Sequence, residues 1–132
     1  MSSLAISPSV EDVLFLKSKF KEANWKLDVA DSYQEALAKL RQTQAPVVLS
    51  QCQLPDGTWK DVLGLLAPML HRPRLIVFSR QVDDRLWAEV LNLGGFDLLA
   101  TPFREHEVEL VFAVGSAWLD WKGEQERRPK SK

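Results

Sequence analysis

The segment at residues 46–57 (PVVLSQCQLPDG) constrains the fold of this chain most, because it places a short apolar run between two turn signals. Residues 47–49 (VVL) form the run, with Pro46 before it and a Pro-Asp-Gly turn signal after it. A run of this kind predicts a buried strand that leads into a loop. Where such strands are parallel, helices cover both faces of the sheet and the loops at the carboxyl ends carry the chemistry. The polar residues 50–53 (SQCQ) are therefore the first candidates for a functional site.

Four more segments carry strand signals, and helix signals stand between them. The predicted strands are residues 4–6, 26–30, 74–78 and 96–100. Helix-start signals lie at Ser9, Ser32 and Thr58, and Asp83 and Asp84 are expected in the first turn of a fourth helix. A fifth helix is predicted over residues 105–121. Five strands that alternate with five helices imply a flavodoxin-like, doubly wound α/β fold. We expect a five-stranded parallel sheet in the order 2-1-3-4-5 with helices on both faces.

The composition indicates one ordinary globular domain. The net charge of −1 gives no strong field that would favour nucleic acid or a membrane surface. No apolar run reaches the roughly 18 residues of a membrane span, and the amino terminus lacks a signal-peptide pattern, so we expect a cytoplasmic protein. We predict one domain over residues 1–122 and a disordered charged tail over residues 123–132 (GEQERRPKSK). No glycine-rich phosphate cradle follows a predicted strand, so we do not expect an enzyme.

Three blocks together resemble a response-regulator receiver domain of bacterial-type two-component signalling: VVLSQCQLPDG, RLIVFS and GGFDLLATPF. The resemblance covers residues 4–121. It implies a phosphorelay domain in which two acidic residues end the first strand and an aspartate at the end of the third strand takes a phosphoryl group from a histidine kinase. It also implies magnesium held by the carboxylates, a Ser or Thr after the fourth strand, and a lysine before a proline after the fifth. The matching bond of the family suggests a cis peptide at Thr101-Pro102.

Most of that site is missing when the family pattern is carried onto this sequence. The acidic pair falls on Ser7 and Pro8, the phosphoacceptor on Gln51 and the lysine on Thr101, while Ser79 keeps the hydroxyl. Magnesium usually binds through carboxylates and phosphate oxygens, and an amide is a poor nucleophile. We therefore expect a pseudo-receiver without a magnesium site or any other cofactor. The simplest expectation for Gln51, Ser79 and Thr101 is that they hydrogen-bond one another and the loop backbones.

Other residue types near the predicted site have alternative interpretations. Asp56 lies beside the pocket and is an alternative phosphoacceptor, although an Asp before Gly usually serves turn geometry. Cys52 is a candidate redox sensor, although a lone Cys just past a buried strand is more often an inert small hydrophobe. His71 and His106 lie far apart in the sequence without metal-ligand spacing, so we expect no metal site.

The predicted fifth helix carries apolar residues on two faces. The face expected to pack on the sheet contains Val108, Val111, Phe112, Gly115 and Leu119. The opposite stripe contains Leu110, Val114, Ala117 and Trp121, with Trp118 at the boundary, and we expect Trp87 of the fourth helix to extend the same surface. An exposed apolar stripe that ends in tryptophan is a candidate protein-contact surface. The alternative is a helix that is merely apolar, or one that the tail covers.

These observations lead to one hypothesis and one alternative. The hypothesis is a stand-alone pseudo-receiver that works by protein–protein interaction without aspartyl phosphorylation. Its partner would be a histidine kinase, another signalling protein or a second copy bound through the fourth and fifth helices, and not nucleic acid or a membrane. The alternative is a phosphorelay receiver that is still phosphorylated at a non-standard residue such as Asp56.

Overall fold

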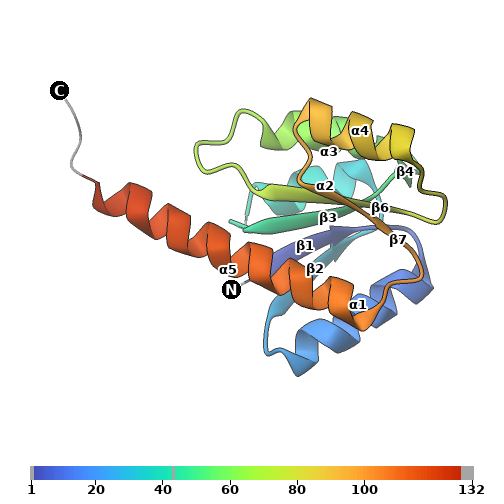
Figure 1. Cartoon of the computed structure of the whole chain (residues 1–132), viewed down its shortest axis with the longest axis horizontal. Helices are drawn as coiled ribbons and strands as arrows, with labels where there is room; N and C mark the ends of the chain where they lie inside the picture. The colour runs from blue at the N-terminus through green and yellow to red at the C-terminus, as the bar shows by residue number, and fades with distance from the viewer. Residues whose placement is uncertain (1, 43, 129–132) are drawn as a thin grey trace.

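The computed structural model describes residues 2–42 and 44–128, and its centre is a parallel five-stranded sheet (Figure 1). The strands are β1 (Ser2–Ile6), β2 (Lys26–Ala30), β3 (Val47–Gln51), β6 (Arg74–Ser79) and β7 (Asp97–Ala100). They lie in the order β2-β1-β3-β6-β7, and each neighbouring pair is parallel. Because β6 and β7 are the fourth and fifth strands of this sheet along the chain, the predicted flavodoxin-like order 2-1-3-4-5 is confirmed.

Helices cover both faces of the sheet (Figure 1). One side carries α1 (Val10–Glu22) and α5 (Glu105–Arg127), and the other carries α2 (Tyr33–Leu40), α3 (Trp59–Leu66) and α4 (Asp84–Leu93). The alternation along β3 shows how the two cores form. Val48 belongs to the core beneath α2, α3 and α4, whereas Val47 and Leu49 belong to the core beneath α1 and α5. All three are fully buried, as the apolar run predicts for a strand covered on both faces.

The predicted helix starts are found in the structure. The side chains of Ser9, Ser32 and Thr58 each accept a hydrogen bond from a backbone amide in the first turn of the following helix. Asp83, expected in the first turn of α4, lies just before it and caps it in the same way. Such contacts satisfy amide groups that the helix itself leaves unpaired. At the other end of α4, Gly94 has φ of 110°, a left-handed conformation that glycine adopts without steric cost. Capping chemistry therefore sets these helix boundaries locally.

Two features differ from the sequence-based expectations. A short antiparallel hairpin, β4 (Gln53–Leu54) and β5 (Gly57–Thr58), follows β3 and was not predicted, because two-residue strands are too short to show a periodic pattern. The predicted disordered tail is also wrong over its first five residues. Helix α5 continues through Arg127, with an i,i+4 ion pair of 3.5 Å between Lys122 and Glu126, while residues 129–132 lie outside the described residues.

None of the helices in the part of the chain that the structure describes combines the length and the apolar character that crossing a bilayer requires.

Two helical glycines give a matched test of this packing. A Cβ at Gly115 of α5 would lie 2.8 Å from ring atoms of Trp25, whose ring already packs against Phe20 and Phe112. A Cβ at Gly64 of α3 would meet nothing within 4 Å. We expect G115A to lower the free energy of unfolding by about 1–3 kcal/mol through overpacking. We expect G64A to raise it by about 0.8–1 kcal/mol through helix propensity.

Urea denaturation of the two variants and the wild type measures both effects. If G115A proved as stable as G64A, the close packing of α5 on Trp25 would be refuted.

Candidate functional site

The four polar residues predicted to end the strands come together at the carboxyl edge of the sheet. Ser7 follows β1, Gln51 and Ser79 end β3 and β6, and Thr101 follows β7. A cavity of about 330 Å³ lies at this edge. Its lining comprises Asp12, Gln51, Cys52, Gln53, Ser79, Arg80, Gln81 and Thr101. Of the five predicted pocket residues, Gln51, Ser79 and Thr101 line this cavity, whereas Pro8 is exposed and Ser7 contacts the lining through its hydrogen bond to Gln51.

Hydrogen bonds hold the side chain of Gln51 at both ends. Its Oε1 accepts from Ser7 Oγ at 2.7 Å, and its Nε2 donates to the carbonyl oxygen of Gln53 at 3.1 Å. Ser7 Oγ also accepts from the backbone N–H of Ser9 at 3.0 Å. The expected hydrogen bonds to loop backbones are confirmed for Gln51 and for Ser79, whose Oγ accepts from the backbone N–H of Gln81 at 3.3 Å. No hydrogen bond among the side chains of Gln51, Ser79 and Thr101 occurs in the described residues, so that part of the expectation is wrong.

Two charged side chains of the pocket were missed by sequence reasoning. Asp12 of α1 lines the cavity with only 6% of its surface exposed, and Arg80 lies at the rim, 3.6 Å from Glu11. In the sequence, Asp12 fits a capping pattern after Ser9, and that local explanation concealed its position. Arg80 directly follows the end of a strand, which is the signal by which it could have been found.

Asp56, the alternative phosphoacceptor, is engaged away from the cavity. Its carboxylate accepts from the backbone N–H groups of Tyr33 at 2.7 Å and Gln34 at 3.0 Å, in the first turn of α2. The hydrogen bond from Tyr33, with a smaller contribution from Gln34, holds the pKa of Asp56 below its ordinary value of 3.8. Asp56 thus ties the β4–β5 hairpin to a helix amino terminus, in addition to occupying the turn.

The remaining chemical candidates are not placed together. Cys52 is half-buried, and burial followed by the charge of Glu89 raises the pKa of its thiol above 9.0, which disfavours the reactive thiolate. The ring of His71 packs edge-on against Trp121 at 5.9 Å, while His106 is exposed at the start of α5. Within residues 2–42 and 44–128, no group of three or more His, Cys, Asp or Glu could hold a metal.

The peptide bond between Thr101 and Pro102 is cis, as the family resemblance suggested. It lies between β7 and α5, and the backbone N–H of Thr101 donates to the carbonyl oxygen of Ser79 at 3.0 Å. Thr101 itself is 8% exposed at the cavity wall.

The faces of α5 differ from those predicted. Val114 and Trp118, expected on or beside the outer stripe, are buried at 9% and 2% exposure, whereas Leu119, expected inside, is 38% exposed. Trp118 Nε1 also donates to the carbonyl oxygen of Arg72 at 2.9 Å. The buried stripe advances by three or four residues from Val108, so that it rotates towards Trp118 at the end of the sheet. Trp118 and Val114 therefore belong to the core.

An exposed apolar surface still remains beside this helix. Trp87 of α4 is 50% exposed, Phe96 before β7 is 46% exposed and Leu110 of α5 is 44% exposed. Ala117 is exposed, and Trp121 is half-buried beneath the guanidinium of Arg74, which lies 5.3 Å from its ring. A groove of about 310 Å³ lies beside α5, lined by Arg74 of β6, Phe96 before β7, and Ala113, Val114, Ala117 and Trp118 of α5. We call Trp87, Phe96, Leu110 and Ala117 with this groove the α4–β7–α5 face.

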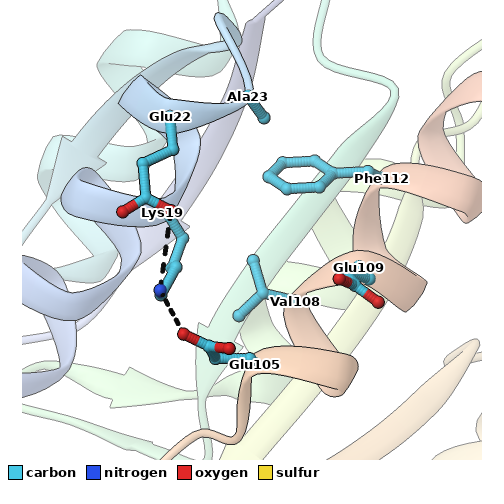
Figure 2. Close-up of a pocket in the computed structure, with 7 residues that line it drawn as sticks. All are labelled: Lys19, Glu22, Ala23, Glu105, Val108, Glu109 and Phe112. Carbon is cyan, nitrogen blue, oxygen red and sulfur yellow. Dashed lines mark hydrogen bonds and ion pairs between the residues drawn. The ribbon is translucent and has the colours of Figure 1, made fainter.

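A second groove separates α1 from α5 (Figure 2). Lys19 of α1 points across it and its Nζ lies 2.6 Å from a carboxylate oxygen of Glu105, with Glu22 at 3.5 Å. The hydrogen bond raises the pKa of Lys19 and lowers the pKa of Glu105, so both remain charged. Val108 and Phe112 form the apolar wall of this groove of about 290 Å³. The cation of this groove, Lys19, is already paired with Glu105, and this ion pair links α1 to α5.

Comparison with known proteins identifies the fold. No protein-family model and no curated protein sequence matches the chain. Among solved structures, a two-component response regulator from Clostridium difficile is 21% identical, with a TM-score of 0.76 over 91% of this chain and 96% of the other. The Francisella response regulator 1452 receiver domain is 23% identical, with a TM-score of 0.77 over 90% and 97%. The beryllofluoride-activated NtrC4 receiver domain dimer is 17% identical, with a TM-score of 0.81 over 89% and 98%. The fold is that of response-regulator receiver domains.

The lowered pKa of Asp56 gives a pH prediction. A depressed pKa stabilises the folded state above the unfolded pKa, and this stabilisation is lost as the pH falls through the folded value. Replacing Asp56 by Asn removes the charge, so D56N should be less stable than the wild type at pH 7 and should lose less stability than the wild type on acidification below pH 4. Urea denaturation from pH 7 to pH 2.5 measures this difference.

Asp31 provides the control, because it is exposed just before the same helix and no side-chain hydrogen bond to it occurs among the described residues. D31N should keep the acid dependence of the wild type. If the unfolding free energies of D56N and the wild type fell equally with pH, the hydrogen bonds from α2 to Asp56 would be refuted.

Proposed function

Because the chain has the receiver fold, we propose that it is a pseudo-receiver: a signalling module that acts through protein contact and without conventional aspartyl phosphorylation. The proposal gives the fold its usual place in two-component signalling and assigns the changed pocket a structural role. The proposed function requires no catalytic step by this chain. Partner binding would control the signalling activity of the chain.

One observation carries this proposal, namely the amide at the end of β3. Gln51 stands at the position where the family resemblance expects the phosphoacceptor, and Ser7 and the Gln53 carbonyl occupy both ends of its side chain. A carboxylate can form an acyl phosphate, whereas a carboxamide is a poor nucleophile. Thr101 supplies no cation that would stabilise phosphoryl oxygens. These two differences each remove one requirement of phosphoryl transfer.

The pocket residues also do not fit the magnesium ion of phosphorylated receivers. That ion usually binds one or two carboxylates together with phosphate oxygens. At the end of β1, Ser7 has its hydroxyl committed to Gln51 and Ser9, and Pro8 has no ligand atom in its side chain. Asp12 is the one carboxylate of the cavity lining, and it comes from α1 rather than from a strand end.

The alternative, phosphorylation of Asp56, has less support. Its carboxylate already accepts two backbone hydrogen bonds from α2. Transfer of a phosphoryl group to either oxygen would have to break at least one of these contacts and uncap the helix. Asp56 is also absent from the lining of the cavity.

The α4–β7–α5 face is the surface that we assign to the partner. Its large apolar side chains are 44–50% exposed, and aromatic residues are the commonest energetic centres of protein interfaces. A solved receiver domain of this fold is described as a dimer, so a second copy of this chain is the first partner to test. Binding there would shift the conformational population of the chain only as far as its differential affinity allows.

The proposed lack of aspartyl phosphorylation is tested with a small-molecule phosphodonor and magnesium, in parallel with a receiver that retains its aspartate. We expect no added phosphoryl mass on this chain. We also expect no changes centred on Gln51, Ser79 and Thr101 in the amide NMR spectrum after addition of beryllofluoride and magnesium. A phosphoryl group that is released by hydroxylamine, or clear shifts centred on Gln51, would defeat the proposal. Location of that group on Asp56 would establish the alternative.

The partner face is tested by Trp87→Glu. A tryptophan at the centre of an interface often contributes about 2 kcal/mol or more, so W87E should weaken association by about 30-fold or more. Its unfolding free energy should change by no more than about 0.5 kcal/mol, because Trp87 is half exposed. Sedimentation velocity across a concentration series measures self-association, and capture of a histidine kinase or another signalling protein from the native host measures other partners.

Leu14→Glu is the matched control, since Leu14 is 60% exposed on α1 and away from this face. A wild type that stays monomeric at high concentration, with W87E and L14E indistinguishable in capture, would rule out the α4–β7–α5 face.

A further inference from the structure

Asp12 is a buried carboxylate that the proposed function does not use. It is the third residue of α1, it is only 6% exposed, and its side chain lines the cavity at the carboxyl edge of the sheet. Gln51, Ser79 and Thr101 line the same cavity. The carboxylate oxygens are not among the fully buried atoms, so without a protein partner they are solvated only through the cavity.

The helix cap does not supply that partner. Ser9 Oγ accepts from the backbone N–H of Asp12 at 3.3 Å, which is half of a capping box. The other half would be a hydrogen bond from Ser9 N–H to the Asp12 carboxylate, but Ser9 N–H donates to Ser7 Oγ at 3.0 Å. Within the described residues, no hydrogen bond or ion pair reaches the carboxylate of Asp12. The helix dipole favours an acidic group there but provides only part of the compensation.

The other charges at the cavity balance each other. Arg80 is the one cation of the lining, and its guanidinium lies 3.6 Å from Glu11, with both side chains largely exposed. The remaining lining residues are neutral amides, hydroxyls and the Cys52 thiol, whose raised pKa keeps it protonated. Asp12 is therefore the one charged residue of the lining without a counter-ion among the described residues.

We propose that this cavity binds a primary ammonium group, with Asp12 as its counter-ion. An ammonium has three N–H donors, which match the carboxylate and the hydroxyl oxygens of Ser79 and Thr101. The hydroxyl of Thr101 has no other hydrogen-bond partner among the described residues. A single carboxylate is a poor site for a divalent cation, which takes more oxygen ligands. The volume of about 330 Å³ is within the range of small-ligand pockets.

The ammonium has two possible sources, a small organic amine or a lysine side chain of a protein partner. Both present the same group on a short apolar chain. The inference goes beyond the proposed signalling role, because it depends on neither the α4–β7–α5 face nor the loss of phosphorylation.

The test is an amide NMR titration of the full chain with n-butylammonium chloride in an amine-free buffer. We expect saturable shifts at Asp12, Ser79 and Thr101. Sodium chloride and sodium butyrate at the same ionic strength should produce none of them. A second titration with Nα-acetyl-lysine N-methylamide separates the sources: comparable affinity supports a lysine side chain, and binding of butylammonium alone supports a free amine.

Asp12→Asn keeps the shape of the side chain and removes its charge, so it should weaken butylammonium binding at least tenfold. Asp84→Asn is the matched control, because Asp84 is an exposed first-turn carboxylate of α4 away from the cavity, and it should bind like the wild type. Ser79→Ala, which removes one acceptor, should weaken binding about threefold and serves as the second variant if D12N fails to fold.

Three results would overturn the proposal. The first is the absence of saturable shifts with either amine. The second is undiminished binding by D12N, or by S79A if D12N does not fold. The third is saturation of the same amides by magnesium chloride but not by butylammonium.

Discussion

Burial of the central strands on both faces is the constraint on which the rest of this structure depends. Leu4 and Ile6 of β1 pack into the core beneath α2, α3 and α4, while Ala5 packs beneath α1 and α5. Strand β3 is divided in the same way. Because the strands are parallel and covered on both sides, their carboxyl ends meet at one edge, where the chain must leave the sheet for the next helix. That edge brings Ser7, Gln51, Ser79 and Thr101 together although 94 residues of sequence separate the first from the last.

At that edge, hydrogen bonds between neutral groups link residues that the family resemblance expects to be charged. Ser7 bridges the Ser9 backbone and the Gln51 amide, and Gln51 reaches on to Gln53. Fully satisfied polar groups of this kind stabilise one arrangement of the loops without requiring an ion. In the same network the N–H of Ser9 donates to Ser7 Oγ and not to the carboxylate of Asp12. The Asp12 carboxylate therefore has no hydrogen-bond partner among the described residues. The two proposals about this pocket therefore arise from one set of contacts.

The helices show where pattern reasoning succeeds and where it fails. The starts at Ser9, Ser32 and Thr58 were predictable, since a capping side chain and its amide partner lie within three residues. Which residues of α5 face the sheet was predicted only in part, because both candidate faces are apolar and periodicity cannot rank two apolar stripes. Trp118 is buried because Arg72, distant in sequence, offers a carbonyl acceptor to its indole. Leu119 is exposed because the buried stripe rotates past it.

Local chemistry in the sequence determined where the strands lie along the chain, most helix boundaries and the identity of the residues at the strand ends, since each depends on apolar runs, capping residues and short turns. The strand order was predicted from the handedness of parallel crossovers, not from local chemistry. The positions of Asp12, Asp56 and Trp118 depended on contacts between segments 22 or more residues apart, or on competition for a single donor. Asp56 serves α2 rather than the cavity because the β4–β5 hairpin carries it to the amides of Tyr33 and Gln34. Such contacts leave no periodic signal, because they arise only when packing brings distant donors and acceptors within hydrogen-bonding distance.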